Sequence, residues 1–392
     1  MLKNSLKELI EKPISGEWGN EGGSTKVIRT TNFTNIGVIN YENVVLRDIE
    51  QNKIDLKKLI KGDIVIEKSG GSPTQPVGRV VFFDSNEVFL CNNFTAILRP
   101  KPELVFPKYL HYILFVSHQK GLTSSFQNKT TGIINLQLAK YIENLQIPLP
   151  PLEQQKKIAA ILDAADAYRQ KTKALIAKYD ELTQSLFLDM FGDPVKNEKG
   201  WEKKNLASIL DFLTSGSRGW AKYYSDKGDL FLRIQNVGYN KLRLDDLCYV
   251  NTPNNAEAKR TKLIPGDIVL SITADLGRTA VVPENFPDAY INQHLAILRL
   301  TKENNPIYVS SFIASKGGQT LFNKLDKGGV KAGLNFTDIK SYNILCPPIE
   351  LQNQFAERVQ VIEQQKAQAQ ASLEKAEELF NSLLQRAFKG EL

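Results

Sequence analysis

Hydrophobic residues recur at alternating steps of three and four along a stretch that begins at Pro150 and continues to about Met190. This spacing lines one side of a helix with apolar side chains, so that the helix can wind along another helix. The stretch therefore predicts one long helix. Its seam includes one polar residue, Thr172, and otherwise contains Ile158, Ile161, Ala165, Tyr168, Leu175, Tyr179, Leu182 and Leu186.

A second stretch with the same pattern begins at Pro347. Both stretches open with two prolines, an aliphatic residue and a glutamate, which suit the first turn of a helix. One such pattern alone is typical of an ordinary amphipathic helix on a globular core. Two copies favour two long helices, each about 57 Å long, that pack antiparallel and join two globular bodies. The second predicted seam is Phe355, Val359, Ile362, Lys366, Ala369, Leu373, Ala376, Phe380, Leu383 and Ala387.

The rest of the chain is repeated as well, which indicates a duplicated domain. Short runs rich in Val and Ile predict buried strands in each copy, and a helix that starts with proline follows late in each. We expect an α+β body with a twisted, mostly antiparallel sheet. The matched segments are Ser15-Gly16 with Ser215-Gly216, 27–32 with 231–236, 61–68 with 265–272, Arg79 with Arg278, 91–100 with 291–300, and the helices that begin at Pro107 and Pro306.

Length and composition fit an ordinary globular protein of two or three domains, with 392 residues, 42% apolar and 24% charged. No apolar run reaches the length of a membrane span, and the N-terminus has no apolar signal core. The three cysteines, Cys91, Cys248 and Cys346, are widely scattered. This spacing argues against a disulfide framework or a zinc ribbon. We therefore expect a reducing, cytoplasmic setting.

The net charge of +7 is unevenly distributed along the sequence. Residues 153–193 contain 6 Lys/Arg and 7 Asp/Glu, and residues 350–391 contain 5 and 7, so the remainder carries +10. The positive charge thus falls on the predicted globular bodies. This distribution suits bodies that touch nucleic acid and helices that touch protein.

The sequence offers no catalytic, cofactor or metal motif. Leu149 and Cys346 precede the proline pairs, where an amino-methyltransferase would place Asn or Asp. A glycine-rich turn for a methyl donor or dinucleotide and a phosphate-binding loop are also missing from the sequence. The three histidines lack partners at metal-ligand spacing. We interpret a carboxylate pattern at Asp193, Glu202 and Lys204 as chance.

Four polar loops, at 67–79, 127–132, 215–228 and 324–335, are the candidate DNA-binding segments. Arg, Lys, Asn and Gln can read base edges, and Ser, Thr and Lys can hold phosphates. Taken singly, each loop could be an ordinary solvated surface loop, and core packing is the favoured alternative for the aromatic residues. The candidates are Lys68, Ser69, Ser72, Thr74, Gln75, Arg79, Asn128, Lys129, Thr130, Arg218, Trp220, Lys222, Tyr223, Arg278, Lys324, Lys327 and Lys331.

The duplicated body, each copy ending in a Pro-Pro-aliphatic-Glu-x-Gln helix, resembles the specificity subunit of Type I restriction-modification systems. The motifs are Pro150 to Gln155 and Pro347 to Gln352, with Gly-Asp-Ile-Val strands at Gly62 and Gly266. The resemblance implies two target recognition domains that each read one half of a split site on double-stranded DNA. It also implies two methylase (modification) subunits, which supply catalysis, and restriction subunits as partners.

The predicted fold is α+β, with two similar target recognition domains joined by two long helices in an antiparallel coiled coil and an internal pseudo-twofold duplication. The domains span 1–149 and 194–346, and the helices span 150–193 and 347–392. We expect a non-catalytic subunit that recognises a bipartite, asymmetric DNA site and directs methylation and restriction by its partners. Two other functions stay open, a self-contained DNA methyltransferase and a coiled-coil scaffold without a nucleic acid role.

Overall fold

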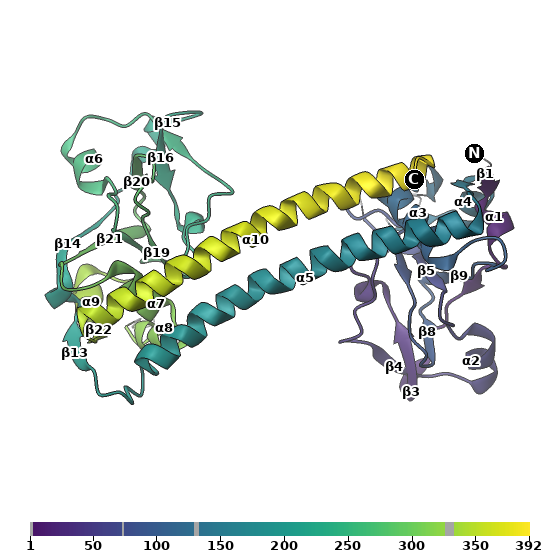
Figure 1. The fold of residues 1–392 in the computed structure, drawn as a ribbon, viewed down its shortest axis with the longest axis horizontal. Coiled ribbons are helices and arrows are strands. Elements are labelled where there is room, and N and C mark those ends of the chain that lie inside the picture. Colours follow the sequence, from purple (N-terminus) through teal and green to yellow (C-terminus); the bar gives the residue numbers. More distant parts are fainter. Residues whose placement is uncertain (1–2, 73, 129–132, 326–332) are drawn as a thin grey trace. The chain divides into compact units, whose positions relative to one another are not determined.

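The chain folds into two compact units, and each is built from two separate parts of the sequence. A computed structural model describes residues 3–72, 74–128, 133–325 and 333–392. The first unit contains residues 1–173 and 371–392, and the second contains residues 174–370. Helices α5 (Leu152–Phe191) and α10 (Ile349–Lys389) each contribute one end to each unit (Figure 1).

The first unit is a set of small sheets covered by helix α3 (Pro107–Gln119). One antiparallel sheet has the order β2-β9-β5-β7, and a second has the order β4-β3-β8 with a parallel β3–β8 pair. A third sheet has the order β10-β11-β6, and β1 pairs with β12. The strands are β1 (Lys3–Ser5), β2 (Ile14–Ser15), β3 (Asn20–Ile28), β4 (Val45–Asp48), β5 (Ile64–Glu67), β6 (Ser69–Gly71), β7 (Val80–Phe82), β8 (Phe89–Cys91), β9 (Thr95–Leu98), β10 (Gln127–Asn128), β11 (Ile134–Leu136) and β12 (Gln146–Pro148).

The second unit repeats most of this plan. Sheet β14-β21-β18-β19 corresponds to β2-β9-β5-β7, and the sheet with a parallel β16–β20 pair corresponds to the one that holds β3 and β8. Helix α7 (Pro306–Ala314) takes the place of α3. The strands are β13 (Glu202–Asn205), β14 (Leu210–Ser215), β15 (Tyr224–Ser225), β16 (Asp229–Leu232), β17 (Tyr249–Val250), β18 (Ile268–Ser271), β19 (Thr279–Val281), β20 (Ala289–Ile291), β21 (Leu295–Leu300) and β22 (Asn343–Cys346).

Short helices complete both units, and no helix in the described ranges combines the length and hydropathy of a membrane span. The α+β class and the internal duplication are confirmed, whereas the expectation of a single sheet in each body is wrong. The short elements are α1 (Leu6–Leu9), η1 (Thr30–Asn32), α2 (Gln51–Lys57), η2 (Ser124–Phe126), α4 (Leu138–Asn144), η3 (Leu206–Ile209), η4 (Trp220–Tyr223), η5 (Ile234–Asn236), α6 (Ala256–Thr261), α8 (Lys316–Asn323) and α9 (Phe336–Ser341).

The buried aspartate of the repeated Gly-Asp-Ile-Val motif forms an ion pair with an arginine in each unit. Asp63 accepts two hydrogen bonds from the Arg99 guanidinium, at 2.9 and 2.8 Å, and is 1% exposed. Asp267 and Arg299 repeat this arrangement at 2.7 and 2.8 Å. Because a fork-shaped guanidinium matches a carboxylate in two places, the pair fixes the start of one strand against the end of another.

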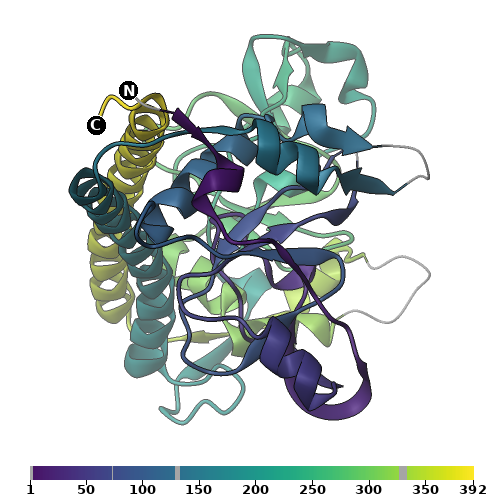
Figure 2. The ribbon, with the colours of Figure 1, turned by 90° about the vertical axis from the view of Figure 1, so that its right-hand side faces the viewer.

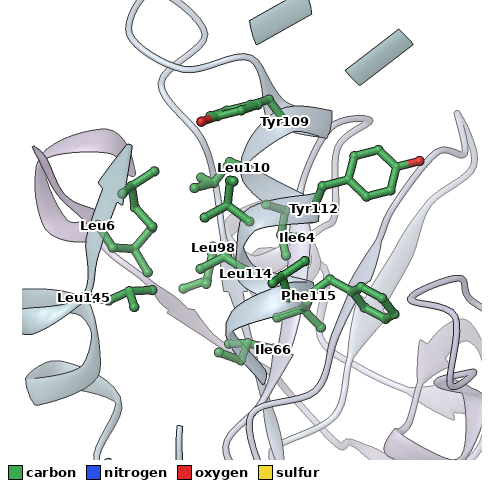
Figure 3. Close-up of a cluster of buried hydrophobic side chains, with 14 of the residues drawn as sticks. Leu6, Ile64, Ile66, Leu98, Tyr109, Leu110, Tyr112, Leu114, Phe115 and Leu145 are labelled. Atoms are coloured by element: carbon green, nitrogen blue, oxygen red, sulfur yellow. The ribbon is translucent and has the colours of Figure 1, made fainter. Parts of the chain in front are cut away.

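The core of the first unit lies between α3 and the inner faces of the strands. Figure 3 shows side chains of α3, including Leu110 and Leu114, next to Ile64 and Ile66 of β5. All four residues are buried, and the cluster extends to Phe380, Leu384 and Ala387 of α10. Residues more than 200 positions away in the sequence therefore complete this core.

The two long helices pack antiparallel in each unit. In the first unit, the Arg169 guanidinium lies 4.2 Å from the centre of the Phe380 ring, and Lys173 pairs with Glu377 at 2.8 Å. In the second unit, Lys366 pairs with Asp180 at 2.5 Å, and the Phe187 and Phe355 rings lie 5.8 Å apart. In both places the contact moves backward along α10 as it moves forward along α5, which confirms the antiparallel prediction.

The predicted seam of the second helix is confirmed almost throughout. Phe355, Val359, Ile362 and Phe380 are buried. The exceptions are Lys366, which is half-buried, and a shift near the C-terminus, where Leu384 is buried in place of Leu383.

The seam of the first helix was predicted one residue too early in every second position. Ile161, Tyr168, Leu175 and Leu182 are 46%, 55%, 43% and 49% exposed. Their C-terminal neighbours face inward instead, with Leu162 and Arg169 buried and Ile176 and Thr183 half-buried. Hydrophobicity alone ranks Tyr168 above Arg169, but a guanidinium can be buried when it stacks on an aromatic ring.

The glutamine of the repeated Pro-Pro motif ties each long helix to the domain helix that starts with proline. Gln155 is 1% exposed, accepts a hydrogen bond from the Phe106 amide at 2.8 Å and donates to the Pro150 carbonyl at 2.8 Å. Gln352 likewise accepts from the Asn305 amide at 2.9 Å and donates to the Pro347 carbonyl at 2.8 Å. The motif is thus a structural clasp in both copies.

We expect Phe380→Ala to lower the free energy of unfolding of the first unit by about 3–5 kcal/mol, because it opens a cavity in the core. Leu379, one position earlier on α10, is 57% exposed. Leu379→Ala should therefore change stability by less than about 0.5 kcal/mol. Urea unfolding of both variants tests the packing, and equal losses would contradict it.

His111 is buried in α3 next to Phe82 and Phe115 and should make stability depend on pH. Burial, reinforced by the Lys108 charge, lowers the pKa of His111 to about 3. The unfolded chain binds a proton near the ordinary value of 6.5, so stability is lost as pH falls below that value. The loss should reach about 2 kcal/mol near pH 5. Urea unfolding near pH 7.5 and near pH 5 measures the loss of stability on acidification. This loss should be about 2 kcal/mol smaller in His111→Leu than in the parent. An identical loss in both proteins would contradict the lowered pKa of His111.

Candidate nucleic-acid interface

Two of the predicted polar loops meet on one small sheet in the first unit. Strand β6 belongs to the segment 67–79, β10 belongs to the segment 127–132, and β11 follows that segment. Strand β11 joins them, because Ile134 pairs with Gly71, Asn135 pairs with Ser69, and Gln127 pairs with Leu136. In the view of Figure 2 this sheet and the long helices lie on opposite sides of the first unit.

A four-residue turn, Asn92 to Thr95, adjoins this sheet. The Thr95 amide donates to the Asn92 carbonyl at 3.0 Å, which puts Asn93 and Phe94 at the tip. The Phe94 carbonyl accepts from the amides of Lys68 and Ser69 at 2.9 and 3.2 Å. Three segments distant in sequence therefore form one surface, which we call the first tip: the described residues of 69–75, 92–95 and 127–136.

The repeated Ser-Gly pair packs beneath this turn. A Cβ atom at Gly16 would lie 2.0 Å from the Asn92 carbonyl oxygen, and one at Gly216 would lie 2.2 Å from the Ile291 carbonyl oxygen. Real Cβ atoms do not approach an oxygen so closely, so both positions require glycine. The close approach fixes the position of each turn in its unit.

Several candidate residues of the first tip are engaged with one another. Ser69 Oγ donates to Asn135 Oδ1, and Ser72 closes a tight turn by accepting from the Gln75 amide at 3.1 Å. Thr74 Oγ1 lies 3.2 Å from Ser72 Oγ. These contacts order the tip and leave the Gln75 side chain without a hydrogen bond to the described residues.

Lys68 lies at the edge of the tip, and its side chain contacts Ser15, which is outside the tip. Its Nζ donates to Ser15 Oγ at 3.0 Å. Partial burial lowers the pKa of this amine, with a further contribution from the nearby Lys57 charge.

The side chains left available at the first tip are uncharged. Within the described residues, Gln75, Asn93 and Asn128 are exposed, and their side-chain amide groups make no hydrogen bond. Phe94 is 44% exposed and Ile133 is 50% exposed. The sequence analysis missed Asn93, Phe94, Ile133 and Asn135. Polar residues lie between two strands in both repeats, Asn92-Asn93 in the first and Asn292-Gln293-His294 in the second. This recurrence could have indicated Asn93 and its neighbour Phe94.

Arg79 lies inside the first unit rather than on its surface. Its guanidinium donates to both carboxylate oxygens of Glu67, at 2.8 and 3.0 Å, and to the Thr30 carbonyl at 3.3 Å. The Arg79 side chain is 15% exposed and that of Glu67 is 4% exposed. In this structure the pair holds β5 next to the loop that follows it.

The second unit brings together the segments that correspond to the first tip. Thr273 and Gly333 form a bridge, and the Leu334 amide donates to the Ile272 carbonyl at 2.9 Å. His294 occupies the place of Phe94 in the turn, and its Nδ1 lies 2.7 Å from Thr273 Oγ1. Arg278 pairs at 2.5 Å with Asp275, whose side chain is 60% exposed.

The loop at 215–228 divides into a buried part and an exposed part. Trp220 is 4% exposed, stacks on Phe231 with ring centroids 4.9 Å apart, and donates to Glu257 Oε1 at 2.6 Å. It therefore packs in the core, the alternative favoured by the sequence. Arg218 and Lys222 are exposed, and Lys222 lies 5.0 Å from the centre of the half-buried Tyr223 ring.

Four candidates, Lys129, Thr130, Lys327 and Lys331, lie outside the described residues. Lys324 follows the end of α8. Among the residues that the structure describes, no group of three His, Cys, Asp or Glu side chains is placed to hold a metal ion.

The chain contains the same family domain twice. A family model described as the Type I restriction modification DNA specificity domain matches residues 3–180 and again residues 198–378. The chain belongs to this family. The duplication seen in both sequence and fold is therefore a duplication of the specificity domain.

Curated relatives match over most of the chain. The EcoKI specificity subunit of a type I restriction enzyme from Escherichia coli is 27% identical over 365 residues, covering 86% of this chain and 76% of that protein. The putative MjaX specificity subunit from Methanocaldococcus jannaschii is 24% identical over 362 residues, covering 86% and 81%.

Solved structures share the fold at full length. The crystal structure of a Type I restriction-modification S subunit from M. genitalium superposes with a TM-score of 0.59 at 16% identity, covering 99% of this chain and 96% of that one. A chain from a study of type I restriction-modification complex assembly gives a TM-score of 0.59 at 17% identity, covering 100% and 98%. The specificity-domain fold thus extends over both units.

The Glu67–Arg79 pair provides a stability test with a matched control. Arg79→Met leaves a buried carboxylate without its partner and should cost about 3–5 kcal/mol in urea unfolding. Glu67→Gln combined with Arg79→Met removes the unpaired charge and should recover much of this loss. Arg278→Met should cost less than about 1 kcal/mol, because Asp275 is mostly exposed. Equal losses for Arg79→Met and Arg278→Met would contradict a structural role that only Arg79 has.

Proposed function

We propose that this chain is the DNA-recognition subunit of a Type I restriction-modification complex and reads a bipartite, asymmetric site on double-stranded DNA. Residues 1–149 and 194–346 act as the two target recognition domains in this proposal. Residues 150–193 and 347–392 act as the connecting helices. Membership in the specificity-domain family, matched once in each half of the chain, carries the proposal.

The difference between two otherwise similar units supports an asymmetric site. Both units hold the same turn over the same glycine, but the first turn carries the exposed Asn93 and Phe94, and the second carries the half-buried Gln293 and His294. A shared framework with different turn residues is the arrangement expected when each unit reads a different half-site.

Affinity and sequence discrimination have separate sources in this proposal. Exposed basic residues, such as Arg218 and Lys222, contact phosphates and bind all sequences alike. The tip residues contact base edges. Lys129, Lys327 and Lys331 are further phosphate contacts on the basis of their sequence alone.

We further propose that partner subunits carry out the chemistry. Two methylase subunits supply methyl transfer, and restriction subunits supply cleavage. The named relatives are specificity subunits of type I restriction enzymes, which supports assembly with such partners. The cytoplasm, where chromosomal DNA lies, is the setting in which we expect the complex to act.

Mapping methylated bases in cells that express this chain with its methylase subunits tests the proposal. The parent should methylate one sequence made of two defined halves. Gln75→Ala in the first unit should relax one half only, and Gln293→Ala in the second unit should relax the other half only. Each lost bidentate contact should reduce discrimination at one base pair by about 1–3 kcal/mol.

Three results would contradict this proposal. Either variant could leave both halves unchanged, which would mean that the tips do not read DNA. The methylated positions could lack any shared sequence. The purified chain alone could transfer a labelled methyl group to DNA, which would favour a self-contained methyltransferase.

A further inference from the structure

The first tip combines uncommitted amides with exposed apolar side chains and has no charge in its described part. The sequence segments 69–75, 92–95, 127–128 and 133–136 contain no Lys, Arg, Asp or Glu. Two basic groups beside these segments make contacts within the unit: Lys68 Nζ donates one hydrogen bond to Ser15 Oγ at 3.0 Å, and Arg79 pairs with Glu67. This composition differs from the lysine- and arginine-rich surfaces that bind phosphates.

These side-chain types discriminate between base pairs in the major groove. Asn and Gln pair with adenine through two hydrogen bonds, and apolar side chains contact the C5-methyl group of thymine. Arg and Lys are the usual partners of guanine. A tip that offers Gln75, Asn93 and Phe94 is therefore suited to adenine–thymine pairs.

Phe94 is held ready for such a contact. Its backbone is fixed on both sides, because its carbonyl accepts from Lys68 and Ser69 and the turn is closed by the Thr95 amide at 3.0 Å. The side chain is nevertheless 44% exposed. A rigid backbone that presents an exposed ring loses little conformational entropy on binding, which favours a specific contact.

We propose that Phe94 contacts the C5-methyl group of a thymine in the half-site read by the first unit, next to adenines read by Gln75 and Asn93. Ile133, which is 50% exposed and immediately precedes β11, extends the apolar surface. This proposal rests on the proposed function. It makes Phe94 a specificity-determining residue of the first unit.

The second unit supplies an internal comparison. At the same position of its turn, His294 hydrogen bonds with Thr273 and with the Gln293 amide group, at 2.7 and 3.0 Å. Its ring is polar and committed to the unit. We therefore expect removal of a thymine methyl group to weaken the contact with this turn only in the half-site read by the first unit.

Replacement of thymine by deoxyuridine tests the contact, because it removes the methyl group and leaves base pairing intact. The complete complex with its methylase subunits is titrated against duplexes that carry the mapped site, with one thymine replaced at a time. One replacement in the first half-site should weaken binding about fourfold, the value of one buried methyl group. Phe94→Ala should bind the thymine and deoxyuridine duplexes equally.

Controls separate this contact from general effects. Leu56 is 75% exposed on α2, away from the tip segments in sequence. Leu56→Ala should keep the fourfold difference. Ile133→Ala should reduce the difference only if Ile133 shares the contact, and a larger loss in Ile133→Ala than in Phe94→Ala would overturn the assignment to Phe94.

The remaining outcomes are decisive in different ways. Specific binding that is insensitive to every deoxyuridine replacement, or a first half-site that contains no thymine, would overturn the Phe94 proposal and leave the proposed function intact. A fourfold difference that persists in Phe94→Ala would also overturn it. Absence of sequence-specific binding by the parent complex would instead overturn the proposed function.

Discussion

Each unit depends on burying helix residues that come from two distant parts of the chain. Phe380 and Leu384 of α10 belong to the same core as Leu110 and Leu114 of α3. In the second unit, Phe187 of α5 and Phe355 of α10 share one core with Tyr308 of α7. Because neither core is complete without both helices, each end of these connecting helices is also part of a globular unit. The Gln155 and Gln352 clasps strengthen this dependence with buried hydrogen bonds.

The duplicated framework and the variable tips obey different physical constraints. Asp63 and Asp267 are buried under the partly exposed Arg99 and Arg299, and loss of either arginine would leave an uncompensated buried charge. The glycines at 16 and 216 leave no room for a side chain. By contrast, Asn93, Phe94 and Gln75 reach solvent, so their identity has little effect on folding. Both units can therefore keep one fold while the residues at the tips differ.

Sequence reasoning recovered those features that hydrophobic spacing determines. The duplication, the antiparallel long helices and nearly all of the α10 seam followed from it. It failed on α5, where Ile161 and Leu162, or Leu175 and Ile176, are adjacent and equally apolar. Only the partner's geometry decides between them, and stacking on Phe380 buries Arg169 instead of Tyr168. A pattern read from one helix alone cannot contain that information.

The candidate site shows the same limit at the level of single side chains. Residue type marked Arg79 as a base reader and passed over Phe94, although Arg79 is engaged with Glu67 and Phe94 is exposed. A charged residue in a polar loop can be consumed by a carboxylate that the sequence places 12 residues away. An apolar residue can be exposed because the turn that carries it is fixed through its backbone. The surface available to a ligand is therefore decided by what remains after the fold has satisfied its own hydrogen bonds and charges.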